Sequence, residues 1–162
     1  MKDRRIAKSP EDLPKLDEVL SMSGLELMQA MARGEMAGPP IAETLGYTIK
    51  SIDDGRAVFA GTPEFKTLNP LGTVHGGWYG TLLDSCMACA VQTKVPQGST
   101  YTTLEYKINI IRPIKLGTPI EAIGTAHHVG RSTGIATGEI RGTEDGKLYA
   151  TGSTTCIIMK IG

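Results

Sequence analysis

The chain has 162 residues, the size of one ordinary domain, and its 17 basic and 17 acidic residues give a formal net charge of zero. Balanced charge gives no strong overall field, so neither nucleic acid nor a membrane surface is an expected partner, and an anionic ligand would need a local basic cluster. No apolar run reaches about 18 residues and no signal-peptide stretch follows the first residues, while an odd count of three cysteines predicts reduced thiols in a cytoplasmic protein.

The beginning of the chain reads as an arm followed by a helix. Residues 1–24 are mostly polar and contain two prolines, so we expect a loose arm outside the main domain. Leu27, Met28 and Met31 then recur at helical spacing, which predicts an extra N-terminal packing helix. Residues 25–162 are expected to form a single domain.

A hairpin and a long helix are the next predicted elements. Strands over 45–52 and 56–62 flank an Asp-Asp-Gly hairpin turn at 53–55. The segment 74–94 lacks proline and is apolar nearly all round. A helix of that kind is buried on several sides.

The second half of the chain is strand-like. Segments separated by turns that contain glycine or proline predict strands over 102–112, 120–129, 133–142 and 148–159. Consecutive strands joined by short turns indicate a meandering antiparallel sheet. A buried helix ahead of four long strands indicates that this sheet curves around the helix, so the predicted fold class is α+β.

Asp84 is the most informative residue of the predicted helix. An unpaired carboxylate is rarely buried, because desolvating its charge costs several kcal/mol, and aspartate also has poor helix propensity. A buried salt bridge or a bond to a neighbouring loop is the plain explanation. Spacing favours a functional one, because Gly76, Gly80, Asp84 and Ala88 recur every four residues and leave a groove that holds one carboxylate.

The predicted helix begins at His75-Gly76-Gly77. Free backbone N–H groups at a helix start carry partial positive charge and can hold a carbonyl oxygen that becomes an oxyanion. Asp84 lies about 12 Å along the axis from Gly76, at about 1.5 Å per residue. One chain therefore cannot easily supply both groups to the same carbonyl, whereas two subunits of a dimer can.

These motifs together resemble the phenylacetate-pathway (PaaI-like) branch of the hotdog-fold thioesterases. The resemblance rests on Asn69-Pro70-x-Gly72-x-x-His75-Gly76-Gly77 followed by a helix with Asp84, and on Tyr106-x-x-x-x-x-Arg112-Pro113, Gly130-Arg131-Ser132-Thr133, Gly146-Lys147 and the final strand. It covers nearly everything after about residue 25. The combined spacing is specific, whereas His-Gly-Gly alone would be weak.

The resemblance implies a hotdog-fold acyl-CoA thioesterase that is at minimum a homodimer and suggests a homotetramer. In this family the carboxylate that matches Asp84 is the nucleophile or general base. The amide that matches Gly76 polarises the thioester carbonyl from the opposite subunit, and the match of Asn69 helps to position the thioester or water. A Ser or Thr on the first strand after the helix is catalytic in some members, which implies Thr103, with Thr102 as the alternative.

Coenzyme A carries phosphates, so cations and hydrogen-bond donors are expected at its entrance. Arg112, Arg131, Ser132 and Thr133 are the substrate-binding candidates, and Gly77 at the helix start is a further one. In related thioesterases the positions that match Arg112, Ser132 and Thr133 lie near the nucleotide end. Ordinary solvated surface is the plain explanation for each basic residue.

Other reactive side chains are assigned lesser roles. His75 is an alternative base, although a histidine at a helix start more often orients the loop by a hydrogen bond. Cys86 and Cys89 have redox-motif spacing but lie inside an apolar helix, where thiols are not activated. His127 and His128 are adjacent in a strand and point to opposite faces. We expect neither a metal nor a cofactor, apart from the coenzyme A of the substrate.

Two other functions stay open at this point. A hotdog-fold enoyl-CoA hydratase or dehydratase would transfer protons with His75 and Asp84, but the sequence lacks a dehydratase-like His-Phe-Pro stretch. A non-catalytic acyl-CoA-binding protein would not need Asp84. The sequence identifies no acyl group, and it does not choose between direct attack by Asp84 and activation of water.

Overall fold

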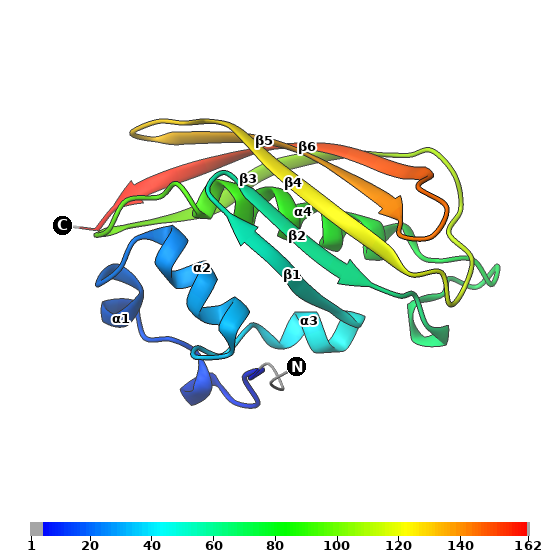
Figure 1. Cartoon of the computed structure of the whole chain (residues 1–162), viewed down its shortest axis with the longest axis horizontal. Coiled ribbons are helices and arrows are strands. Elements are labelled where there is room, and N and C mark those ends of the chain that lie inside the picture. Colours follow the sequence, from blue (N-terminus) through cyan, green and yellow to red (C-terminus); the bar gives the residue numbers. More distant parts are fainter. Residues whose placement is uncertain (1–4, 162) are drawn as a thin grey trace.

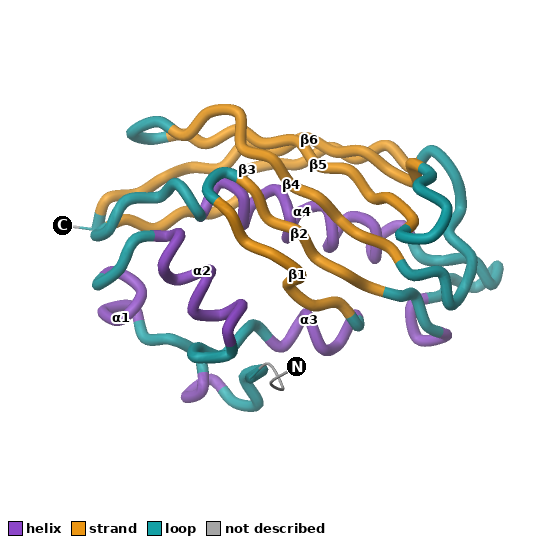
Figure 2. Tube along the Cα trace, in the orientation of Figure 1, coloured by secondary structure: helices purple, strands orange, loops and turns teal. Residues whose placement is uncertain are grey.

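The computed structural model describes residues 5–161 and has the predicted α+β class. One six-stranded antiparallel sheet curves around the long helix α4, and smaller helices lie beside it (Figures 1 and 2). The helices are α1 (Leu16–Leu20), α2 (Gly24–Arg33), α3 (Pro40–Leu45) and α4 (Gly76–Gln92). The strands are β1 (Tyr47–Asp53), β2 (Arg56–Gly61), β3 (Ser99–Ile110), β4 (Ile120–Val129), β5 (Thr133–Gly142) and β6 (Leu148–Lys160). All six strands and the long helix were predicted, with ends that differ by a few residues.

The sheet order is β1-β2-β4-β5-β6-β3, so the predicted meander is wrong for β3. Besides the β1–β2 hairpin, only β4, β5 and β6 follow one another as neighbours through short turns. The connection at 111–119 carries the chain from β3 at one edge across to β4 next to β2. As a consequence β3 is an edge strand, and within the described residues its outer side pairs with no other strand.

Helix α4 fills the concave side of the sheet. Its apolar surface is buried all round, with Leu82, Leu83, Cys86 and Met87 fully covered. The sheet lets the helix backbone approach closely at Gly124, where a Cβ atom would lie 2.0 Å from the carbonyl oxygen of Cys86. The burial explains why the sequence of this helix has no polar face, and it makes a carboxylate on it exceptional.

The N-terminal segment is more ordered than the loose arm that we expected from its polar composition. Residues 5–23 include a 3₁₀ turn and α1, and backbone hydrogen bonds join Ala7 to Gly38 (3.0 Å) and Gly38 to Arg5 (2.9 Å). The predicted packing helix is confirmed as α2, with Ser23 as its N-cap. Together α1, α2 and α3 lie beside β1, α4 and the start of β3 (Figure 1). The domain boundary at residue 24 stays a prediction.

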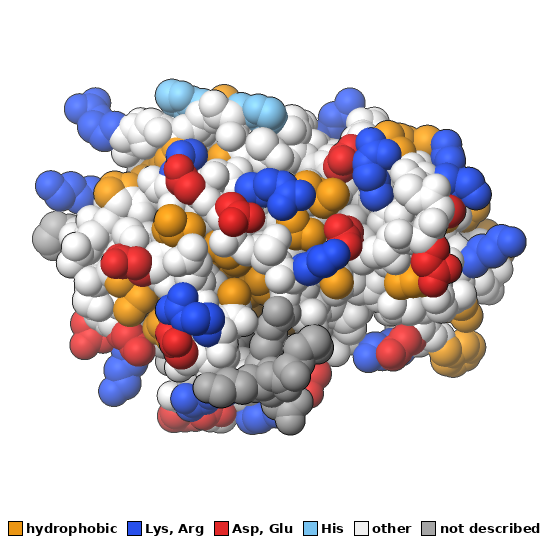
Figure 3. All heavy atoms as spheres, viewed as in Figure 1, with side chains coloured by type: hydrophobic (Ala, Val, Ile, Leu, Met, Phe, Trp, Pro, Cys, Tyr) orange, Lys and Arg blue, Asp and Glu red, His pale blue; other side chains and the backbone are white. Residues whose placement is uncertain are grey.

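Surface charge is mixed. On the face drawn in Figure 3, basic and acidic side chains are interspersed, and apolar patches lie between them. Among the helices of residues 5–161, none combines the length and the apolar character needed to cross a membrane.

Candidate active site

Asp84 lies in the middle of α4 and faces the edge strand β3. Its side chain is half-buried, and the hydroxyl of Thr103 donates a hydrogen bond to Oδ1 at 3.0 Å. Burial raises the pKa of Asp84, and the Thr103 hydrogen bond opposes part of that rise. In residues 5–161 Asp84 forms no ion pair, so a buried salt bridge does not explain it there.

The hydrogen bond also distinguishes the two threonines that the sequence left open. Alternate residues of a strand point to opposite faces. Thr103 points to the helix and is half-buried, whereas Thr102 is exposed. Thr103 therefore has the contact that a site role requires.

The loop before α4 is held by Asn69 and His75. The side-chain oxygen of Asn69 accepts from the amides of Leu71 (2.9 Å) and Thr73 (3.2 Å), so Asn69 organises the loop rather than facing the carboxylate of its own chain. His75 is the N-cap of α4, and its Nδ1 accepts from the amide of Gly77 at 2.8 Å. This contact matches the loop-orienting role, and it occupies the amide of Gly77, which was a predicted substrate contact.

Gly76 is left as the free donor at the start of α4. Its amide makes no hydrogen bond among the described residues, while the amides on either side donate to Thr67 and His75. The nearest side chain to a Cβ at this position would be Ile110, at 3.7 Å, which places Gly76 beside the far end of β3. Gly76 and Asp84 thus lie about two helical turns apart on the same side of α4, as their spacing predicted.

The predicted coenzyme A contacts are split between two ends of the sheet. The amide of Arg112 donates to the carbonyl of Tyr149 at 3.3 Å, whereas the carbonyl of Ser132 accepts from the amide of Ile158 at 2.9 Å. Tyr149 and Ile158 lie on the same strand, so the two ends are about 30 Å apart at roughly 3.3 Å per residue. Arg131 and Thr133 flank Ser132, and one chain therefore does not bring the predicted set together.

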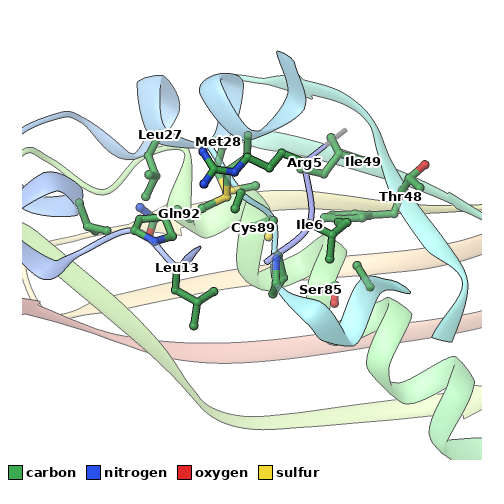
Figure 4. Close-up of a pocket in the computed structure, with 18 of the residues that line it drawn as sticks. Arg5, Ile6, Leu13, Leu27, Met28, Thr48, Ile49, Ser85, Cys89 and Gln92 are labelled. Atoms are coloured by element: carbon green, nitrogen blue, oxygen red, sulfur yellow. The ribbon is translucent and has the colours of Figure 1, made fainter. Parts of the chain in front are cut away.

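A cavity of about 520 Å³ lies next to this region and was not predicted. We call it the N-terminal chamber; it is lined by residues of the segment 5–49, Phe59 of β2, α4 and the start of β3. Figure 4 shows side chains of α2, such as Leu27 and Met28, facing Ser85 and Cys89 of α4 across it. One signal in the sequence could have revealed it, since Ser85 adds a second polar side chain directly after Asp84 in a mostly apolar helix.

The thiols of Cys86 and Cys89 lie in surroundings that do not activate them, as predicted. Burial raises the pKa of Cys86 far above its usual range and that of Cys89 to about 12. Within residues 5–161, no group of three His, Cys, Asp or Glu side chains is placed to hold a metal ion.

Known proteins resemble this chain in both sequence and structure. Residues 71–149 match the thioesterase superfamily. The structure resembles a variant of the phenylacetic acid degradation protein PaaI from Thermus thermophilus, with a TM-score of 0.66 and 30% sequence identity over 73% of this chain and 97% of that one. The chain belongs to the thioesterase superfamily and has its hotdog fold. Gly76, Asp84 and Thr103 all lie inside the matched superfamily region.

Two further relatives of this superfamily bear on the ligand. Acyl-coenzyme A thioesterase PaaI of Escherichia coli K12 is 32% identical over 58% of this chain and 65% of its own length. The chain thus spans less than two thirds of that curated relative, and of a Caenorhabditis elegans esterase it spans 54%. A thioesterase protein of Streptococcus pneumoniae TIGR4 was crystallised with coenzyme A and superposes with a TM-score of 0.64 at 27% identity, over 71% of this chain and 87% of that one.

Proposed function

We propose that the protein hydrolyses acyl-CoA thioesters to a free acid and coenzyme A, with Asp84 as the nucleophile or general base. The observation that carries the proposal is a half-buried carboxylate, without an ion pair in residues 5–161, held by Thr103 on an open sheet edge. Superfamily membership and the acyl-coenzyme A thioesterase relatives support the substrate class.

The chemistry follows from the equipment around Asp84. A thioester carbonyl is electrophilic and its thiolate leaves readily. Asp84 either removes a proton from water, so that hydroxide attacks the carbonyl carbon, or attacks that carbon itself to give a mixed anhydride that water then cleaves. In both routes the C–S bond breaks, the thiolate leaves as coenzyme A, and a backbone amide stabilises the oxyanion. The raised pKa of Asp84 is closer to neutral pH than that of an ordinary aspartate, and a general base works best when its pKa is near the operating pH.

The oxyanion donor in this proposal is the Gly76 amide of a second copy. Two copies of β3 paired antiparallel about a two-fold axis near Tyr106 and Lys107 would place Thr103 of one opposite Ile110 of the other. Ile110 is the neighbour of Gly76, and Thr103 is the partner of Asp84. The same operation would bring Arg112 of one copy towards Ser132 of the other, which would reunite the split coenzyme A contacts.

The outer side of β3 suits such pairing. It is a long edge strand with exposed apolar side chains, including Leu104 (60% exposed) and Ile110 (47%). Unprotected apolar edges tend to pair with another strand. We therefore propose a homodimer, while its assembly into a tetramer and its cytoplasmic location stay predictions from the sequence.

The contacts of His75 disfavour the hydratase alternative. A proton relay needs the His75 ring near Asp84, but His75 caps the helix about 13.5 Å away along its axis, at about 1.5 Å per residue. In a site shared by two copies, Nδ1 of the His75 ring still accepts from the amide of Gly77 and is not available as a base. Enoyl-CoA hydration by the pure protein would reverse this judgement.

The decisive assay is thiol release from a panel of acyl-CoAs by wild type and Asp84→Asn. The variant keeps the side-chain volume and can still accept from Thr103, but it is neither base nor nucleophile. We expect at least about a hundredfold loss of kcat, since a general base contributes roughly 10²–10⁴. An Asp84→Asn protein as active as wild type would refute the mechanism, and tight acyl-CoA binding without turnover by wild type would favour a binding protein.

A further inference from the structure

The N-terminal chamber adjoins the proposed reaction centre. Ser85, which lines it, directly follows Asp84, and Cys89 lies one helical turn beyond on the same wall. Tyr101 lines it from β3, two residues before Thr103 and therefore on the same face of the strand, about 6.6 Å away. Burial first, and then the neighbouring Cys89, Cys156 and Asp84, raise the pKa of Tyr101. A group attached to a carbonyl at Asp84 thus has the chamber as its neighbouring space.

The walls of the chamber suit an apolar occupant. Most of its lining side chains are aliphatic, sulfur-containing or aromatic, among them Met28, Met31 and Phe59. The hydroxyls of Tyr47 and Ser85 satisfy each other at 2.9 Å. Among the described lining residues Arg5 alone is charged, and it is largely exposed and lies 3.6 Å from Asp12. A charged acyl tail would therefore have no buried partner.

We propose that the N-terminal chamber holds the acyl group during hydrolysis and selects apolar acyl groups larger than acetyl, an inference that rests on the proposed thioesterase function. A volume of about 520 Å³ lies in the usual range of pockets for small organic ligands, about 300–1,000 Å³. Most of the lining precedes residue 60, outside the matched superfamily region at 71–149. The N-terminal segment, rather than the shared hotdog core, then sets the acyl preference of this chain.

The expected kinetic signature is a rise in kcat/KM with acyl length. Each methylene that enters the chamber should raise kcat/KM about fourfold until the chamber is full, the factor expected for a buried CH₂. The series acetyl-, butyryl-, hexanoyl-, octanoyl- and decanoyl-CoA measures this dependence. Phenylacetyl-CoA is the second arm, and it distinguishes preference for an aryl group from preference for an alkyl chain.

Filling the chamber should abolish the length dependence. Met31→Trp fills it from α2, and Ile49→Trp does so from β1, on the same face of the strand as Tyr47, where a large aromatic side chain should still fold. Ile41→Trp is the matched control, because Ile41 is exposed on α3 and does not line the chamber. We expect a loss of at least about tenfold for octanoyl-CoA, an unchanged rate for acetyl-CoA, and no effect of the control on either substrate.

Calorimetric measurement of free octanoate binding distinguishes a failure of the chamber assignment from a failure of the proposed hydrolysis. Octanoate should bind to wild type and to Ile41→Trp but not to the filled variants. Equal loss for acetyl- and octanoyl-CoA in a folded filled variant, or a wild type that prefers acetyl-CoA, would overturn the chamber assignment and leave the proposed hydrolysis standing. No thioester hydrolysis by wild type, with octanoate binding that the filled variants abolish, would refute the proposed hydrolysis alone.

Discussion

Two neighbouring regions of this molecule differ in almost every physical property. Asp84 and Thr103 form a polar contact on an open sheet edge, inside the part that matches the superfamily. The N-terminal chamber is apolar and built mostly from residues before that part. The difference fits the proposed division of labour, in which the shared hotdog core would perform the chemistry and the N-terminal segment would choose the acyl group.

This division predicts different kinetic effects on the two sides. We call the sheet edge that carries Asp84 and Thr103 the carboxylate edge. Changes there should lower kcat for every acyl-CoA by the same factor, because the reacting atoms are common to all acyl-CoAs. Changes in the chamber should act on long acyl groups and spare acetyl. A variant at the carboxylate edge that discriminates between acyl lengths would erase the distinction between the two regions.

Gly76→Pro removes the proposed oxyanion donor while keeping the helix. Proline is favoured at the first helical position, where its missing N–H and fixed φ do little harm. His75 before it is already extended, with φ −64° and ψ 138°, as a residue before proline must be. We expect kcat to fall about 10²–10³-fold for all acyl-CoAs, the usual effect of deleting one oxyanion donor.

Gly76→Ala is the matched control for that variant. It keeps the amide and adds only a Cβ, which would meet Ile110 at an ordinary 3.7 Å. Most of the activity should therefore survive, and circular dichroism should show both variants folded. Comparable loss in the two variants would mean that crowding, and not the amide, explains the effect.

Thr103→Val should remove one hydrogen bond from Asp84 at nearly constant volume. The hydrogen bond favours the ionised carboxylate, so its loss raises the pKa of Asp84 further and moves the acid limb of the kcat profile to higher pH. We expect kcat at neutral pH to fall about tenfold, the effect of losing a hydrogen bond to a charged group. Thr102→Val, at the exposed neighbouring position, should leave the pH profile in place.

Asp84→Asn should raise the melting temperature at neutral pH by a few degrees. Burial raises the pKa of folded Asp84 above its unfolded value of about 3.9, so the ionised carboxylate costs stability once the pH exceeds the folded pKa. The advantage of the variant should vanish as the pH falls below about 4, where Asp84 is protonated in both states. Calorimetric scans across this range, with exposed Asp53→Asn as control, would contradict the burial argument if the advantage were independent of pH.

The sequence singled out Asp84 and the start of α4 because their signals are local. A carboxylate in an apolar helix, a glycine pair after a histidine and alternating strands each express themselves over a few residues. The structure adds the choice of Thr103 over Thr102, which depends on register across β3 and α4. It also shows that the amide of Gly77 is taken by His75, which no spacing rule indicates.

Long-range arrangement is what the sequence could not supply. The position of β3 next to β6 depends on a crossover at 111–119, while sequential pairing was the reasonable expectation. The polar segment before residue 24 looked loose because its few apolar side chains are scattered. Several of them, including Ile6 and Val19, nevertheless line the chamber, which forms only when helices distant in sequence pack together.

A mixture of two inactive variants can decide whether one site takes Asp84 from one copy and Gly76 from another. Asp84→Asn and Gly76→Pro chains refolded together in equal amounts would give hybrid dimers in which one of the two sites has both intact groups. We predict recovery of about a quarter of the wild-type rate, since about half of the dimers are hybrids with one working site each. A mixture no more active than the better of its two parents would contradict the shared site.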